Sequence, residues 1–210
     1  MRMDKGRILF ALVALLCWLT ISLQLYLHFL ATQQSVAETL IRFFSYFTIL
    51  TNGIVALCFT AMVLPESKLS FFKKPTTLAA TTGYIAVVGA VYNLILRYQW
   101  NPQGINKLVD QLLHTLIPLG FILFWMFAVP KNKLEWKLIL QWLLYPAVYL
   151  IYTLVRGYLT DYYPYPFINV FELGYETAFL NACYVLLAFV VFFSVIIGIG
   201  KLTRKNQVNK

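Results

Sequence analysis

Residues 8–30 read ILFALVALLCWLTISLQLYLHFL, a run of 23 residues without a lysine, arginine, aspartate or glutamate. The hydrocarbon core of a bilayer is about 30 Å thick, and a helix needs about 20 mostly apolar residues to cross it. This stretch therefore predicts a membrane-spanning helix. A cleavable signal peptide is the alternative, because Arg2, Lys5 and Arg7 precede the run. The apolar part of a signal peptide is only about 7–15 residues long, which favours a retained span.

The composition of the whole chain agrees with this prediction. Of the 210 residues, 60% are hydrophobic and 12% are charged, whereas a soluble domain has about 45–50% apolar and about 25% charged residues. A soluble globular protein and a disordered chain are both excluded. The predicted spans are residues 8–30, 41–64, 76–98, 108–129, 138–156 and 176–200. Because the connections are short, we expect an all-α, six-transmembrane-helix bundle that forms a single integral membrane domain over 1–210.

The basic residues indicate how the bundle is oriented. Thirteen of the 17 lysines and arginines fall on one side of the predicted membrane, and four fall on the other. The first group is Arg2, Lys5, Arg7, Lys68, Lys73, Lys74, Lys131, Lys133, Lys137, Lys201, Arg204, Lys205 and Lys210; the second is Arg42, Arg97, Lys107 and Arg156. Excess positive charge marks the cytoplasmic side, so we predict a cell-membrane protein with both termini in the cytoplasm. The charge predicts contacts with anionic membrane lipids rather than with nucleic acid.

Polar residues inside a membrane are candidates for function because the bilayer disfavours them. In the second predicted span, Ser45, Thr48 and Asn52 share one helical face, and Thr51 lies beside it. In the fourth, Asp110 and His114 are four residues apart, so their side chains can meet. The fourth span also carries Gln111 and Thr115, and Arg156 ends the fifth span.

Depth and backbone chemistry single out the two groups further. Thr48 and His114 are each six or seven residues from the outer end of their spans, or about 10 Å at 1.5 Å per residue. Pro118 removes the hydrogen bond to the carbonyl of His114, which predicts a kink and a spare acceptor there. By the same argument, Pro146 predicts a kink in the fifth span.

Three stretches stand out: residues 45–52 (SYFTILTN), residues 110–118 (DQLLHTLIP) and residues 163–167 (YPYPF), the last just before the final span. The first resembles the threonine segment of the androgen-induced-protein family of multispan hydrolases, the second resembles the histidine segment of that family, and the third resembles a further motif of it. The compact six-span form is most similar to the family's bacterial branch of predicted six-transmembrane proteins. The resemblance implies an intramembrane threonine hydrolase that acts on lipid esters, such as fatty acid esters of hydroxy fatty acids.

The resemblance also implies roles for residues. Thr48 would be the nucleophile and His114 its general base, with Thr51 as a competing nucleophile. An alcohol needs an adjacent base to attack an ester, and imidazole, with an ordinary pKa of about 6.5, can act as one. Asp110 could orient the ring.

Further residues could assist the reaction, and other functions stay open. Asn52, Thr51 and Thr115 are candidate donors to an oxyanion, and Arg156 is a candidate for binding a fatty-acid carboxylate. A non-catalytic transporter or binding protein for a small lipophilic molecule is the main alternative, in which Asp110 and His114 relay protons. Haem or quinone binding through His28 and His114 is disfavoured by their different depths.

The cysteines point away from metal chemistry. Cys17, Cys58 and Cys183 all lie in apolar stretches. An odd number of cysteines in such places argues against a disulfide framework and against a zinc site. We therefore predict no metal and no cofactor.

Overall fold

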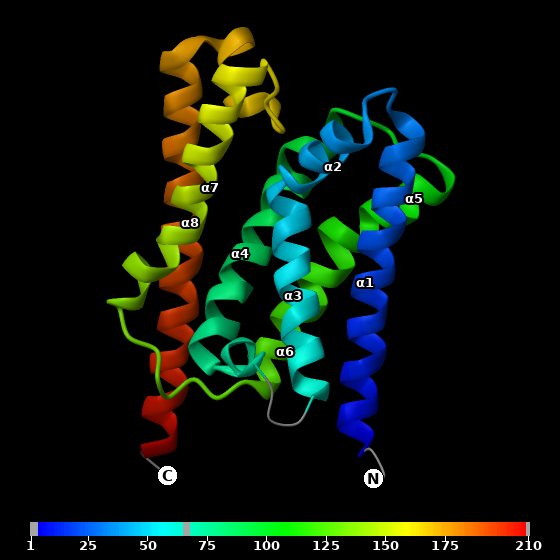
Figure 1. Ribbon diagram of the computed structural model, residues 1–210. Coiled ribbons are helices and arrows are strands. Elements are labelled where there is room, and N and C mark those ends of the chain that lie inside the picture. Colours follow the sequence, from blue (N-terminus) through cyan, green and yellow to red (C-terminus); the bar gives the residue numbers. More distant parts are fainter. Residues whose placement is uncertain (1–3, 65–67, 209–210) are drawn as a thin grey trace. The chain divides into compact units, whose positions relative to one another are not determined.

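The computed structural model describes residues 4–64 and 68–208, and the regular secondary structure of this part of the chain is helical throughout (Figure 1). Five helical stretches are long and apolar enough to cross a membrane, and a bent pair of helices raises the number to six. The five are Lys5–Ala31, Pro75–Tyr98, Gly104–Ala128, Leu138–Thr160 and Val170–Thr203. The predicted all-helical fold with several apolar spans is confirmed. Arg2 and Lys210, which belong to the predicted cytoplasmic segments, lie outside the described residues.

The chain divides into two compact units, Met1–Pro130 and Lys131–Lys210. The elements of the first unit are α1 (Lys5–Ala31), α2 (Val36–Phe44), α3 (Phe47–Val63), η1 (Ser70–Lys73), α4 (Pro75–Leu94), η2 (Leu96–Tyr98), α5 (Gly104–Gln111), η3 (Leu112–Leu116) and α6 (Ile117–Ala128). The elements of the second unit are α7 (Leu138–Thr160), η4 (Pro166–Ile168) and α8 (Val170–Val208).

The first unit is a bundle in which α3 packs between α1 and α4, and α4 packs against α6 (Figure 1). Side chains cap the N-termini of α1 and α2. The Asp4 carboxylate caps α1 by accepting from the Arg7 amide at 2.8 Å, and Ser35 caps α2 by accepting from the Glu38 amide. Such side chains satisfy amide groups that have no partner within the first turn of a helix.

The bend between α2 and α3 contradicts the prediction of one continuous helix over 41–64. The two helices are bent by 74°. The Ser45 hydroxyl donates to the Ile41 carbonyl at 2.6 Å, while the Ser45 amide turns to the Arg42 carbonyl. Tyr46 is then extended, with φ −80° and ψ 122°. A serine hydroxyl that donates to the carbonyl four residues earlier competes with the backbone amide for this acceptor, and this often bends or ends a helix. Ser45 therefore does not share a helical face with Thr48 and Asn52.

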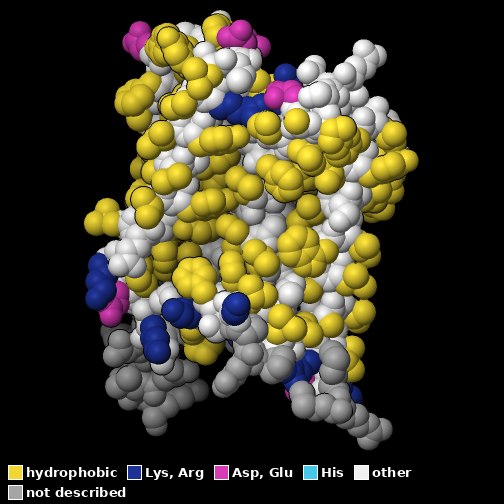
Figure 2. All heavy atoms as spheres, in the orientation of Figure 1, with side chains coloured by type: hydrophobic (Ala, Val, Ile, Leu, Met, Phe, Trp, Pro, Cys, Tyr) yellow, Lys and Arg dark blue, Asp and Glu magenta, His cyan; other side chains and the backbone are white. Residues whose placement is uncertain are grey.

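Apolar side chains cover much of the outer surface of the molecule. Figure 2 shows hydrophobic side chains across most of the face in view, and exposed leucines follow the length of α1, including Leu9, Leu12 and Leu19. Contiguous exposed apolar surface on this scale is unusual in soluble monomers, and it marks contact with a membrane or with other proteins. The surface is therefore compatible with a multi-pass membrane protein.

The second unit pairs α7 with α8, which run antiparallel (Figure 1). The Trp142 and Phe193 rings meet edge to face at 5.3 Å between centroids. At the other end, the Asn181 amide donates to the Phe167 carbonyl at 2.9 Å and holds the connecting segment on α8. α7 continues through Pro146 without ending, and α8 contains a break at Gly174, where φ is 74°.

We expect Gly157→Ala to disrupt the segment that connects α7 and α8. A Cβ atom at Gly157 would lie 2.0 Å from Cε1 of Tyr163, so the ring and the chain that carries it must move. Overpacking of this kind costs about 1–3 kcal/mol in unfolding free energy. Hydrogen exchange should also become faster across residues 161–169. Gly53→Ala is the matched control, because nothing lies within 4 Å of its Cβ position. Tyr163→Ala should restore stability in the Gly157→Ala background, and a Gly157→Ala protein as stable as wild type would contradict the expectation.

Candidate functional site

The apolar helical stretch Gly104–Ala128 changes from α-helical to π-helical geometry around His114. Residues 112–116 form the π-helical turn η3 between α5 and α6, and the Ile117 amide reaches back to the Leu112 carbonyl. The carbonyl of His114 accepts from the Asn93 amide group of α4 at 3.1 Å. Pro118 predicts this spare acceptor, and the structure supplies its donor. π-helical turns inside α-helices occur frequently at functional sites.

Asp110 and His114 meet, as their spacing predicts. Nδ1 of His114 lies 3.2 Å from the Asp110 Oδ1 atom and 3.0 Å from the Asp110 backbone carbonyl. Both side chains are largely buried, with 13% of the imidazole and 8% of the carboxylate exposed. With both acceptors at Nδ1, the neutral ring carries its proton there, which leaves Nε2 as the basic nitrogen. A carboxylate that fixes the tautomer in this way is the arrangement found in hydrolytic triads.

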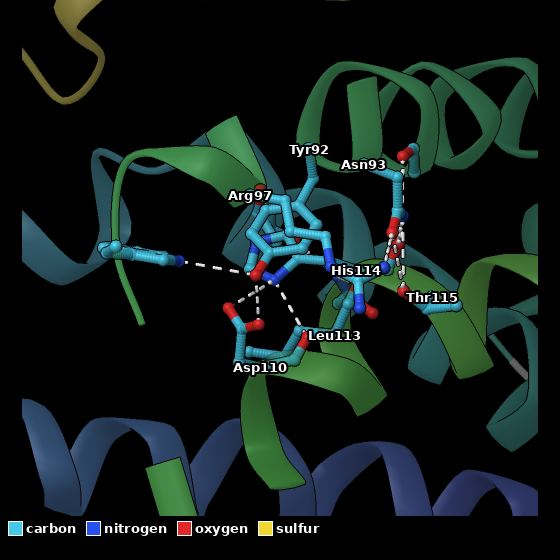
Figure 3. A network of polar contacts seen from close by, with 11 residues as sticks. Tyr92, Asn93, Arg97, Asp110, Leu113, His114 and Thr115 are labelled. Atoms are coloured by element: carbon cyan, nitrogen blue, oxygen red, sulfur yellow. Dashed lines mark hydrogen bonds and ion pairs between the residues drawn. The ribbon is translucent and has the colours of Figure 1, made fainter. Parts of the chain in front are cut away.

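Tyr92 of α4 is a third member of this group, and the sequence analysis missed it. Its ring stacks on the His114 imidazole, with 3.9 Å between centroids and 15° between planes. Its hydroxyl donates to Oδ2 of Asp110 and accepts from the Trp100 indole at 3.4 Å. Figure 3 shows the two rings face to face beside the carboxylate. One carboxylate therefore links the tyrosine and the histidine, and the tyrosine ring covers one face of the imidazole.

Asn93 connects α4 to the π-helical turn. Besides the His114 carbonyl, its amide nitrogen contacts the Gly89 carbonyl at 2.9 Å and the Thr115 hydroxyl at 3.2 Å (Figure 3). A Cβ at Gly89 would lie 3.4 Å from the His114 carbonyl oxygen, so α4 and the turn are in close contact here. Thr115 is thus bonded to Asn93, and a role in binding an oxyanion stays a prediction.

Asn52 joins the threonine segment to the histidine segment. Its amide nitrogen donates to the Thr48 carbonyl at 2.9 Å and to the Leu113 carbonyl at 3.1 Å. Its side chain is fully buried, and Oδ1 has no hydrogen-bond partner among the described residues. Both amide hydrogens are used in these two bonds, so donation to an oxyanion would require one of them to break. Asn52 instead holds the backbone of Thr48 close to the residue that precedes His114.

The two candidate nucleophiles both lie in α3. Thr48 is in the first turn of the helix, because α3 begins at Phe47. Its exposed fraction is 7%, and Thr51 is fully buried. Burial does not distinguish the two threonines, whereas the Asn52 bond favours Thr48 by connecting it directly to η3.

Arg156 and His28 have surroundings of their own. Arg156 lies in the second unit, where its buried guanidinium is 5.2 Å from the centre of the Tyr162 ring. Its contact with a fatty-acid carboxylate stays a prediction. His28 packs beside Phe43 and Tyr46, with centroid distances of 5.8 and 6.4 Å. The described residues contain no cluster of three or more histidine, cysteine or acidic side chains that could hold a metal ion.

Comparison of the chain with protein-family models, with curated proteins and with solved structures gave no match.

Proposed function

We propose that this protein is an enzyme of the cell membrane that hydrolyses lipid esters, with Thr48 as nucleophile and His114 as general base. The observation that carries the proposal is the buried pairing of Asp110 with His114 Nδ1, next to a turn that Asn52 ties to Thr48. The resemblance of residues 45–52 and 110–118 to the androgen-induced-protein family supports the same assignment. Both termini would be cytoplasmic, as the distribution of basic residues indicates, and bilayer lipids would surround the apolar helices.

The proposed chemistry follows from the acid–base groups. Nε2 of His114 accepts the proton of the Thr48 hydroxyl as its oxygen attacks the ester carbonyl. The protonated ring then gives that proton to the leaving alcohol, and the acyl group stays on Thr48. A water molecule, deprotonated by the same nitrogen, releases the fatty acid and restores the threonine. Asp110 stabilises the imidazolium in both steps.

Labelling with a fluorophosphonate probe tests this function. The purified protein in lipid nanodiscs should react with the probe and should hydrolyse acyl esters. Thr48→Ala and His114→Ala should lose labelling and hydrolysis, while Thr48→Ser should retain both, because the serine hydroxyl occupies the same place. Thr51→Ala tests the competing nucleophile and should still react with the probe.

Three results would change the assignment. Labelling that persists in Thr48→Ala but disappears in Thr51→Ala would move the nucleophile to Thr51. Labelling that persists in both would remove both threonines. A folded protein that neither reacts with the probe nor hydrolyses any ester of the panel would favour the alternative, a binding protein or transporter for a lipophilic molecule.

A further inference from the structure

Helix α2 lies across the bundle instead of along it. It has nine residues, which at 1.5 Å per residue is about 14 Å and less than half the thickness of a bilayer core. Its axis is bent by 74° from α3, and α3 packs along α1. Only residues 32–35 separate α2 from the end of α1, so α2 lies at the level where α1 ends (Figure 1). If α1 crosses the membrane, α2 lies close to the membrane plane at one surface.

The side chains of α2 divide into three groups around the helix. Thr39 and Phe43 are buried against the bundle, where the Phe43 ring contacts His28. Glu38 and Arg42 form an ion pair at 2.6 Å, and about 30% of each side chain is exposed. The third group is apolar and exposed, and it consists of Val36, Ala37, Ile41 and Phe44. At 100° per residue, this apolar face is on the side of the helix away from the ion pair.

The surroundings of α2 indicate what covers its apolar face. The segment before it, Thr32-Gln33-Gln34-Ser35, is polar and suits the headgroup layer. The exposed apolar residues Tyr26 and Leu30 lie on the last two turns of α1 at the same end of the unit. A helix with one apolar and one charged face lies in the membrane surface, its apolar side about 5–10 Å into the boundary between headgroups and acyl chains. The same lipid acyl chains that contact the end of α1 can therefore also cover the apolar face of α2.

We propose that α2 is an in-plane membrane helix whose Val36, Ala37, Ile41 and Phe44 insert among the acyl chains of the outer leaflet. The Glu38–Arg42 pair then faces the headgroups, and the bend at Ser45 turns the chain inward to start α3. This inference rests on the membrane location proposed above, but it does not depend on the hydrolytic activity.

Depth measurements on spin-labelled protein test the proposal. The natural cysteines are first replaced, Cys17 and Cys58 by alanine because they are buried and Cys183 by serine because it is exposed. Single cysteines are then introduced at 37, 38, 41, 42 and 44, labelled, and measured in phosphatidylcholine vesicles by their relative access to oxygen and to a water-soluble nickel chelate. Leu12, Leu19 and Tyr26, which are exposed on α1, provide control positions.

An in-plane helix predicts equal depths at 37, 41 and 44, within about 3 Å, and shallower positions at 38 and 42. A broken span that continues into the bilayer predicts instead a steady change of up to about 10 Å from 37 to 44, at 1.5 Å per residue. That result overturns the proposal, as does nickel access at 37, 41 and 44, or exclusion of both reagents by a second protein copy. The α1 labels test the membrane location separately from the in-plane orientation of α2. Nickel access at all three control positions would contradict the membrane location itself.

Discussion

Asp110→Asn is expected to lower the rate of ester hydrolysis by about 10⁴-fold, the size of effect seen when the carboxylate of a hydrolytic triad becomes an amide. The carboxylate has two neighbours with protons to donate, the Tyr92 hydroxyl and Nδ1 of His114. The two donors contact different carboxylate oxygens. Asparagine replaces one of these oxygens by NH₂, so one of the donors loses its acceptor. If its NH₂ group faces His114, only the Asp110 backbone carbonyl still favours a proton on Nδ1. A ring that carries its proton on Nε2 instead can no longer deprotonate Thr48.

The measurement is kcat and KM for a soluble acyl ester with protein in nanodiscs. The loss should fall on kcat, because Asp110 is not expected to contact the bound ester. Asp161→Asn is the control, since Asp161 is exposed and ends α7 in a left-handed conformation that asparagine also adopts. A kcat for Asp110→Asn within about tenfold of wild type would argue against the triad-like role.

Phe121→Ala should cause a large loss of stability. Phe121 is fully buried, and its ring meets Phe59 edge to face at 5.5 Å and Phe124 at 5.7 Å. In a bilayer the transfer from water contributes little, because lipid is as apolar as the core, so the packing term dominates. A cavity of roughly 100 Å³ at about 24 cal/mol per Å³ costs about 2.4 kcal/mol.

Phe127→Ala on the same helix is the matched control, because its side chain is 81% exposed. Its unfolding free energy in mixed micelles should change by less than about 0.5 kcal/mol. Equal losses in the two variants would mean that the aromatic cluster does not form the core of the first unit.

The features that the sequence predicts correctly depend on local spacing. Apolar runs locate the helices because the length of a run and its lack of charge are sufficient signals. Asp110 and His114 meet because four residues make about one turn, although the turn itself is π-helical. Pro118 predicts the spare acceptor at His114, since a proline removes a particular hydrogen bond wherever it lies in a helix.

The missed features depend on contacts between elements. The bend at Ser45 leaves the hydropathy of residues 41–64 unchanged, so only the backbone reveals it. Tyr92 is one of 14 tyrosines, and nothing in its local sequence indicates that α4 will turn its ring onto His114. Asn93 is likewise a single polar residue in its span, and its role comes from the His114 carbonyl that packing brings to it. Asn52 belongs to a predicted polar group, but its bond to the Leu113 carbonyl also depends on packing between helices.

The bend between α2 and α3 also bears on how a substrate would arrive. Thr48 follows the bend by only two residues, so in a membrane its hydroxyl would lie near the depth at which the ester linkages of bilayer lipids are found. A lipid would then need no extraction into water and no flip between leaflets; lateral diffusion in two dimensions would deliver its scissile bond. For such an enzyme, the governing concentration is the mole fraction of ester within the leaflet, not the amount per volume of solution.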